Sequence, residues 1–317
     1  MNLTCHAFQS AGIIQLNCTS ANPGCATSGL RCVEKTRPWL LAVAVLSSYL
    51  TVVVTLYEWS HRKRKQTAAV NRSYVLSVAL TYVFTVSSVI SIYRGSYEIC
   101  LSHKIISMFL YSASTLLNYT LLWTRQRFLH KGHLMGSVTC LMNNYVSYCV
   151  IVGIYATFAA LLTVFFGTVC LIVSDRACLI KYSQHSTNSF IKAAIITFLF
   201  TGVVFKFGLL ALMAHPLHKS NREGCHPDPE IPRLLKRLFY STAVCVTTST
   251  TFGIMLFLDV YNIDCINWEV PGGFDLVASN TAIIFTFSDG CKRIFPVEVC
   301  LKSCGNKRTS ATVIAPT

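Results

Sequence analysis

The sequence predicts an all-α membrane protein: a bundle of seven transmembrane helices, followed by a short eighth helix. Two observations lead to this fold class. The chain is 53% hydrophobic and only 13% charged, and its mean hydropathy is +0.51. It also contains seven long apolar stretches separated by short polar segments. A hydrocarbon core of roughly 30 Å takes about 20 helical residues to cross, whereas a water-soluble domain needs no such stretches.

The seven stretches differ in their few charged residues. The third ends in Arg125, the fifth carries Lys192 and Lys206, the sixth closes with Asp259 and the seventh opens with Asp275. The seventh is the weakest, since several hydroxyl and amide side chains dilute it. The expected spans are Trp39–Trp59, Tyr74–Tyr93, Ile105–Phe128, Tyr145–Val173, Ser189–Ala214, Leu238–Tyr261 and Asp275–Phe287.

Basic residues separate the two sides of the membrane. With the N-terminus outside, 18 lysines and arginines fall on the inner side and seven on the outer side. The positive-inside rule therefore predicts an external N-terminus and a cytoplasmic C-terminus. The net charge of +14 is then a topology signal first, and an attraction to anionic lipid or a cytoplasmic partner second, and no nucleic-acid partner is expected. The inner set is Arg62, Lys63, Arg64, Lys65, Arg72, Arg125, Arg127, Lys131, Lys219, Arg222, Arg233, Lys236, Arg237, Lys292, Arg293, Lys302, Lys307 and Arg308.

Three regions are expected along the chain. Residues 1–36 form an extracellular segment, residues 37–290 the bundle, and residues 291–317 the cytoplasmic eighth helix and tail. The sequences Asn2-Leu3-Thr4 and Asn17-Cys18-Thr19 are acceptors for N-glycosylation on the side that the charge rule places outside. The early apolar run is too short for a cleavable signal peptide, so the first span is expected to act as the insertion signal.

The 15 cysteines divide by compartment. A bridge between Cys100, at the head of the third span, and Cys178, in the loop after the fourth, would pin the second outer loop over the bundle. A second bridge could join Cys32 to Cys265. No partner is assigned to Cys5, Cys18, Cys25 or Cys170. After the last span, Cys291, Cys300 and Cys304 lie in a basic setting that suits S-palmitoylation, with free thiols as the equal alternative.

In topology, nearly the whole chain resembles a rhodopsin-like (class A) G-protein-coupled receptor. Arg125, in Trp123-Thr124-Arg125-Gln126-Arg127, stands where that family carries Asp-Arg-Tyr. Leu76-Ser77-Val78-Ala79-Leu80-Thr81 resembles the Leu-Ser-Leu-Ala-x-Asp segment of the second helix. Thr281-Ala282-Ile283-Ile284-Phe285 resembles Asn-Pro-x-x-Tyr. The resemblance implies that Thr124, Arg125, Gln126 and Phe285 contact a G protein, and that the basic inner loops steer the encounter.

The departures from the family pattern concern residues that restrain the inactive state. Thr81 stands where the family has the aspartate of its sodium site, and Thr124 stands where an aspartate would hold the arginine. A two-state bundle needs a source for its bias toward one state. Because these carboxylates are missing, the sequence leads to the hypothesis of substantial signalling without ligand.

Because family motifs are altered and the loops and tail are short, the chain is similar to herpesvirus-encoded receptors, particularly the gammaherpesvirus orphan group. That resemblance implies coupling to inhibitory (Gi-type) G proteins, a role in immune evasion, and the host plasma membrane as location. The alternative is a ligand-dependent orphan or chemosensory receptor of an animal. A dimer and a monomer are both compatible with the sequence.

Charged residues near the outer ends of the last three spans are candidates for contact with a peptide or small-molecule ligand. These are Lys192, Asp259 and Asp275, for which a salt bridge that closes the mouth is the competing interpretation. Lys206 lies about four turns deeper and is expected to snorkel inward. The hydroxyls of Thr247–Thr251 are expected to bond within their helix or to join neighbouring helices.

No catalytic activity, cofactor or metal is expected. The chain has no glycine-rich phosphate loop, no paired carboxylates, no nucleophile motif and no histidine cluster with metal-ligand spacing. A small-solute transporter is the remaining alternative from another class. Such a protein would be expected to have broken helices or internal repeats, and the sequence indicates neither.

Overall fold

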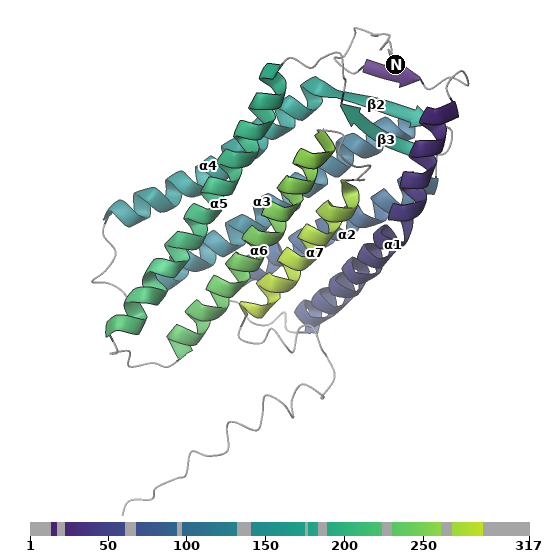
Figure 1. Ribbon diagram of the computed structural model, residues 1–317. Helices are drawn as coiled ribbons and strands as arrows, with labels where there is room; N and C mark the ends of the chain where they lie inside the picture. The colour runs from purple at the N-terminus through teal and green to yellow at the C-terminus, as the bar shows by residue number, and fades with distance from the viewer. Residues whose placement is uncertain are drawn as a thin grey trace, which may run out of the picture.

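The structure is a computed structural model of the 317-residue chain, and it describes residues 14–17, 23–60, 68–93, 97–131, 141–174, 177–182, 189–223, 230–260 and 268–287. Within these residues the chain forms seven helices and three strands (Figure 1). The elements in chain order are β1 (Ile14–Asn17), α1 (Pro23–Ser60), α2 (Ala68–Tyr93), α3 (Tyr97–Lys131), α4 (Leu141–Thr168), β2 (Val169–Ser174), β3 (Ala177–Tyr182), α5 (Ser189–Glu223), α6 (Glu230–Val260) and α7 (Glu269–Phe285).

Five helices are long and apolar enough to cross a membrane, so the protein is membrane-embedded. In α4 apolar residues lie on all sides of the helix instead of on one stripe, as a helix surrounded by lipid and protein requires. The apolar segments are Thr36–Trp59 of α1, Val70–Ser91 of α2, Ser102–Arg127 of α3, Tyr145–Thr163 of α4 and Arg233–Leu258 of α6.

The remaining two helices, α5 and α7, have shorter apolar segments than the other five. Among the described residues of α5 the apolar segment is Leu199–Leu212. α7 has only 17 residues, and 11 of them are buried, including Asp275, Ser279 and Asn280. Its polar side chains are tolerated because they contact other helices instead of lipid. The polar residues that lower the hydrophobicity of the seventh span in the sequence are therefore explained by the position of α7 in the interior of the bundle.

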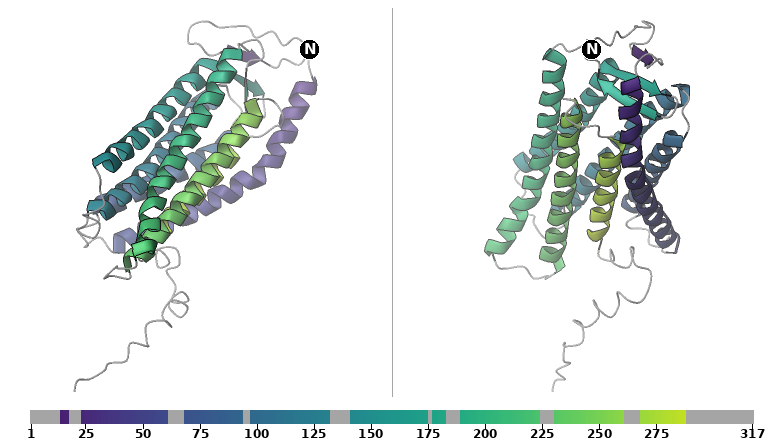
Figure 2. Two further views of the ribbon diagram at one scale, coloured as in Figure 1. Left: turned by 60° about the vertical axis from the view of Figure 1, so that its left-hand side comes forward. Right: turned by 45° about the vertical axis from the view of Figure 1, so that its right-hand side comes forward.

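The helices form a closed ring. Each helix contacts the next one along the chain, and the contact between α3 and α4 is the least extensive of these. α1 closes the ring by packing against α7. α3 also contacts α6 and α7, which places it inside the ring (Figures 1 and 2). Half of the apolar segment of α3 is buried, against 28% of that of α1. α3 is thus the element best placed to link the two ends of the bundle.

A small sheet covers one end of the bundle, and it corrects the expectation of a purely helical fold. β2 and β3 form an antiparallel hairpin with Val173 opposite Cys178, and β1 pairs in parallel with β2 (Figure 1). The fourth span was expected to continue to Val173, but α4 ends at Thr168. Residues Val169–Val173 are rich in β-branched side chains, which favour a strand. Periodicity alone did not separate them from the apolar helix before them.

Several helices extend beyond the expected spans. α1 begins at Pro23, α3 at Tyr97 and α7 at Glu269, and α5 continues to Glu223. α6 begins at Glu230 and includes Pro232 in its first turn. A proline in the first turn of a helix loses no hydrogen bond, because the first four N–H groups have no partner within the helix.

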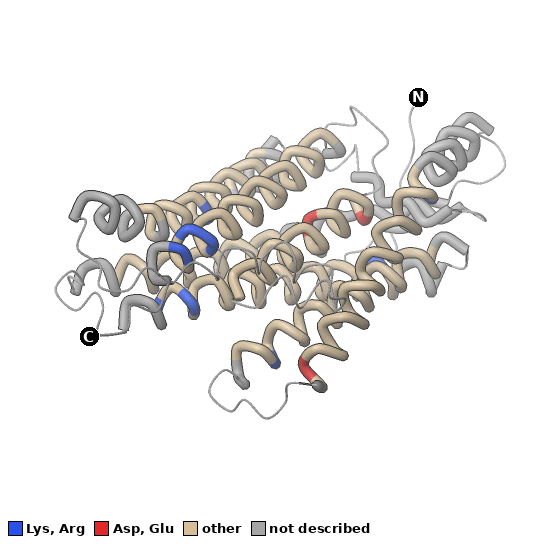
Figure 3. The backbone as a smooth tube through the Cα atoms, turned by 90° about the horizontal axis from the view of Figure 1, so that it is seen from below, with Lys and Arg blue, Asp and Glu red and all other residues tan. Residues whose placement is uncertain are grey.

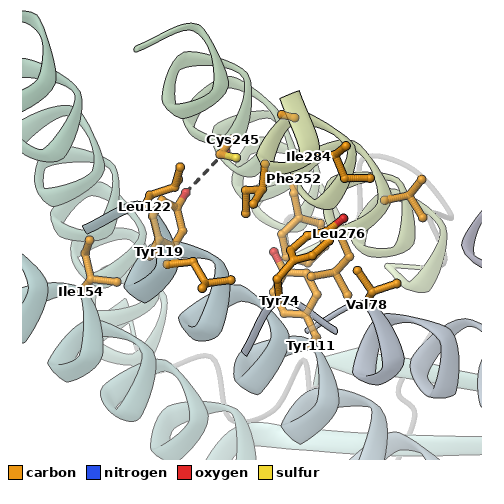
Figure 4. Packing of buried hydrophobic residues seen from close by; sticks show 14 of the residues in the cluster. Tyr74, Val78, Tyr111, Tyr119, Leu122, Ile154, Cys245, Phe252, Leu276 and Ile284 are labelled. Atoms are coloured by element: carbon orange, nitrogen blue, oxygen red, sulfur yellow. Dashed lines mark hydrogen bonds between the residues drawn. The ribbon is translucent and has the colours of Figure 1, made fainter. Parts of the chain in front are cut away.

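Apolar side chains pack inside the ring and also cover its outside. The interior cluster joins Tyr74, Tyr111, Leu122, Phe252 and Ile284, which come from four helices (Figure 4). On the outside, large apolar side chains of α1, α4 and α5 are exposed, among them Val45, Val152 and Phe200. Charged residues are sparse along the described chain (Figure 3). An apolar exterior of this extent is suited to contact with lipid.

Candidate functional site

Polar side chains run along one face of α3 from one end of the bundle to the other. Successive members are three or four residues apart, so they share one face of the helix. All are buried except Arg125, which is half-buried at the end of the row away from the sheet, and Leu122 is the one apolar member. We call this row the α3 stripe; it comprises Lys104, Ser107, Tyr111, Ser114, Asn118, Leu122 and Arg125.

The end of the stripe nearest the sheet is an ionic cluster. Glu269 Oε1, at the start of α7, lies 2.6 Å from Lys104 Nζ and 2.9 Å from His103 Nε2. The Lys104 ammonium also lies 5.9 Å from the centroid of the Trp268 ring. All four side chains are buried. The cluster therefore ties α3 to α7 through a desolvated ion pair.

Glu269 precedes the expected seventh span, and its environment favours the charged form. Burial by itself would raise the pKa of the carboxyl. The positive charge of Lys104 and the contact with His103 more than offset this, and they lower the pKa from 4.5 to about 2. Glu269 consequently remains a carboxylate over the whole physiological pH range.

Asp275 lies in the middle of the bundle, where hydroxyl groups surround it. Tyr111 donates a hydrogen bond to Oδ2 and Thr248 donates one to Oδ1, each at 2.7 Å. The Asp275 side chain is only 3% exposed. It was expected near the outer mouth, facing a ligand or a salt bridge. In the described part of the chain its bonds instead join α3, α6 and α7.

Lys206 also points into the bundle. Its Nζ donates to Ser249 Oγ of α6 at 2.5 Å and lies 5.7 Å from the ring centroids of Tyr119 and Phe158. The residue is 9% exposed, so the expected snorkelling toward the inner surface is wrong. A lysine can stay inside here because the hydroxyl and the two aromatic faces replace part of its hydration.

An uncharged network of hydrogen bonds surrounds Thr81 of α2. Thr81 accepts a hydrogen bond from Asn280 Nδ2 at 2.8 Å, and its hydroxyl lies 2.8 Å from that of Ser114. Ser77 donates to Asn118 Oδ1 at 2.8 Å. These bonds connect α2, α3 and α7 without any formal charge.

The end of the stripe away from the sheet contains the residues predicted to contact a partner. The Arg125 guanidinium stacks on Phe287, with 3.5 Å from Cζ to the ring centroid. Gln126 donates from Nε2 to the Leu212 carbonyl of α5 at 3.3 Å. Thr124 is half-buried and the Phe285 side chain is 45% exposed. The structure thus places Arg125 beside the end of α7 and Gln126 against α5.

Two parts of this site were missed in the sequence. Glu269 and its partners His103 and Lys104 were assigned no role, although an acidic residue beside an apolar span is a recognisable signal. Phe287 was treated only as the end of a motif. The three-to-four spacing of polar residues in α3 is present in the sequence, and this spacing by itself predicts that they share one helix face.

The remaining expected sites lie partly or wholly outside the described residues. Lys192 is on α5, Asp259 on α6, Cys100 on α3, Cys178 on β3 and Cys170 on β2, but only their backbone is described. The same holds for Asn17, Cys25 and Cys32. Outside the described residues are Asn2, Cys5, Cys18, Cys265, Cys291, Cys300, Cys304 and the expected eighth helix.

The described residues define a membrane-embedded helical bundle with a polar row along its central helix. Among these residues no group of three or more His, Cys, Asp or Glu side chains could hold a metal ion. No protein-family model matches the chain, and no curated protein matches its sequence. The function is therefore inferred from the geometry of the site.

Proposed function

We propose that the protein is a divergent rhodopsin-like G-protein-coupled receptor that signals across the plasma membrane. In this proposal all seven helices cross the bilayer, with the N-terminus outside and the C-terminus in the cytoplasm. The partner is a heterotrimeric G protein, with a Gi-type α-subunit favoured. A viral origin, with the host plasma membrane as location, belongs to the same proposal.

The observation that carries the proposal is the position of Arg125. It ends the α3 stripe at the end of the bundle away from the sheet, within a ring of seven helices whose central member is α3. A receptor needs a continuous path from its outer face to its inner face. The stripe supplies one, because its members bond to α2 or α7 at successive levels.

The contacts along this path are suited to a switch between two states. Hydrogen bonds between membrane helices are worth on average about 0.6 kcal/mol each, so several can exchange at modest cost. α6 in particular is attached through two adjacent hydroxyls, Thr248 to Asp275 of α7 and Ser249 to Lys206 of α5. Movement of α6 would break these two bonds and would also separate Phe252 from Tyr111 in the interior cluster.

The inner surface supports contact with a G protein. Arg233, Lys236 and Arg237 are exposed at the start of α6, and this basic surface would attract anionic lipid and an acidic partner. The uncharged network around Thr81 supports the hypothesis of high activity without ligand, since no buried carboxylate there stabilises one state. The proposal assigns the protein no enzymatic activity and no cofactor.

The test is ligand-free activation of a panel of G-protein α-subunits in transfected cells. The wild type is compared with Arg125→Ala at matched surface expression. Arg127→Ala is the matched control, because Arg127 is two residues away and stacks instead on Trp123 and Tyr148. We expect basal activation that Arg125→Ala reduces about tenfold or more and Arg127→Ala leaves nearly unchanged. Activation no higher than in cells without the receptor would contradict the hypothesis of ligand-free signalling.

A small-solute transporter is the second candidate, and one observation favours it. Lys206 and Asp275 are ionisable residues in the interior of a membrane bundle, where such residues often mark a transport path. Solute uptake that Lys206→Met or Asp275→Asn abolishes, with no effect of Arg125→Ala, would replace the receptor proposal with this one.

A further inference from the structure

The Arg125 guanidinium is covered by an aromatic ring at the end of α7. The ring is Phe287, whose centroid lies 3.5 Å from Arg125 Cζ. Phe287 in turn stacks on Tyr74 of α2, with 5.5 Å between the ring centroids. Tyr74 is fully buried and donates a hydrogen bond to the Asn280 carbonyl at 3.2 Å. Three helices therefore meet at this stack.

We propose that Phe287 is a positioning residue that caps Arg125 and holds the receptor in its resting state. This inference rests on the proposed function, because it concerns the residue assigned to G-protein contact. The face of a guanidinium is attracted to the negative face of an aromatic ring. A hydroxyl residue, Thr124, precedes Arg125, so the ring takes the part that a neighbouring carboxylate would otherwise play.

The local backbone makes this cap movable. Thr286 and Phe287 donate their N–H groups to Ile283 and Ile284, three residues back, each at 3.0 Å. A last turn with bonds of this kind is tighter and weaker than the regular helix before it. Phe287 can therefore leave Arg125 through rearrangement of one turn, while the buried part of α7 stays in place.

The strength of the contact sets the expected effect. A cation–π contact shifts a two-state equilibrium roughly two- to thirtyfold, depending on how far it is desolvated. Such a shift favours the capped position of Arg125 and still leaves an uncapped fraction that is available for ligand-free activation. The contact is also weak enough for a partner that offers carbonyl or carboxylate oxygens to displace the ring, since these make charge-assisted hydrogen bonds with arginine.

The first experiment measures ligand-free G-protein activation by Phe287 variants at matched surface expression. Phe287→Leu keeps an apolar side chain and removes the ring, and we expect basal activation to rise roughly two- to thirtyfold. Phe287→Tyr keeps the ring and should restore the wild-type level. Phenylalanine analogues with one, two and three ring fluorines at position 287 should raise activation in that order, because fluorine weakens the negative face without removing the ring.

The second experiment reports on the cap without any G protein. Thr124→Cys is introduced beside Arg125, and its labelling by a bulky maleimide is measured in detergent with and without Phe287→Leu. The protein without Thr124→Cys serves as background. We expect Thr124→Cys to be labelled faster when Phe287→Leu removes the ring. With Phe287→Tyr the labelling rate should equal that of Thr124→Cys alone.

The two readouts separate the inference from the proposed function. Unchanged activation and unchanged labelling in Phe287→Leu would overturn the cap, even where Arg125→Ala abolishes coupling. Faster labelling without G-protein activation in any variant would support the cap and contradict the hypothesis of ligand-free signalling. A rise in activation that the fluorinated series does not follow would show that ring size matters and its charge distribution does not, which also overturns the inference.

Discussion

Individual buried charges in this protein are stabilised in three different ways. Glu269 has a cationic partner, Lys104, at 2.6 Å. Asp275 has neutral hydroxyl donors, and Lys206 has one hydroxyl and two aromatic faces. Of these three arrangements in the described chain, only the first is a salt bridge. Removing one partner from a buried ion pair leaves the other charge without compensation, and this costs more than removing both.

Glu269→Gln is therefore expected to destabilise the protein by about 3 kcal/mol or more, because Lys104 would remain buried without a counter-charge. The measurement is thermal unfolding of the purified protein in detergent. The double variant Lys104→Met with Glu269→Leu is the control and should recover most of the loss. A single variant as stable as the wild type would show that the pair makes no net contribution.

The same pair predicts a pH dependence. The pKa of Glu269 is depressed in the folded protein to about 2 from 4.5, so its contribution is fully present above pH 4.5 and is lost as the pH falls toward 2. The difference in unfolding temperature between the wild type and Glu269→Gln should be nearly constant at neutral pH and shrink once the pH falls below 4.5. A difference that stays constant as the pH approaches 2 would exclude this titration as its source.

At the scale of elements, helices approach one another closely at a glycine, which has no side chain. α7 approaches α1 at Gly273, where a Cβ would lie 2.8 Å from Val43 Cγ1. Val43 is fully buried and its branched side chain has little freedom to move. At Gly253 of α6 the nearest atom to an added Cβ is Leu199 Cδ2 at 3.9 Å, an ordinary contact.

Gly273→Ala is expected to cost roughly 1–3 kcal/mol of stability, whereas Gly253→Ala should be neutral or slightly stabilising. Both substitutions gain the same helix propensity, so their difference reports the clash with Val43. Thermal unfolding measures both, and Val43→Ala should rescue Gly273→Ala. Equal effects at the two glycines would mean that α1 and α7 are not tightly packed at Gly273.

At the scale of the whole molecule, the closed ring and the sheet at one of its ends define two distinct faces. β2 and β3 connect α4 to α5 at the same end as the ionic cluster of Glu269. Arg125, which contacts Phe287 just past the end of α7, and the basic start of α6 lie toward the other end. Combined with the charge distribution of the sequence, this arrangement puts the sheet outside the cell in the receptor proposal.

The orientation has a direct test. In intact cells Asn2→Gln and Asn17→Gln should each remove one glycan, seen as a stepwise gain in gel mobility. An epitope at the C-terminus should become accessible to antibody only after permeabilisation. Thr120→Ala, which removes the sequon at Asn118, is the control and should leave the mobility unchanged, because Asn118 is buried in α3. Tag accessibility without permeabilisation would reverse the proposed orientation.

Much of the fold could be predicted from the sequence, and the errors have physical causes. The long apolar helices were predictable because lipid imposes length and composition directly on them. The end of α4 at Thr168 was not, because a buried strand and a helix can share one apolar run. The interior positions of Asp275 and Lys206 were also missed, since residue spacing along a helix does not reveal which neighbours supply hydroxyls and rings.

The sequence by itself determined that the chain is a membrane-embedded helical bundle and that its charge is distributed unevenly along it, and it predicted that Arg125 contacts a partner. These properties depend on composition and on local spacing, which are present in the chain before it folds. Only the tertiary structure decided that Glu269 pairs with Lys104, that Thr248 and Ser249 join three helices, and that Phe287 covers Arg125. Those contacts join residues far apart in the chain, and their geometry exists only once the helices have packed.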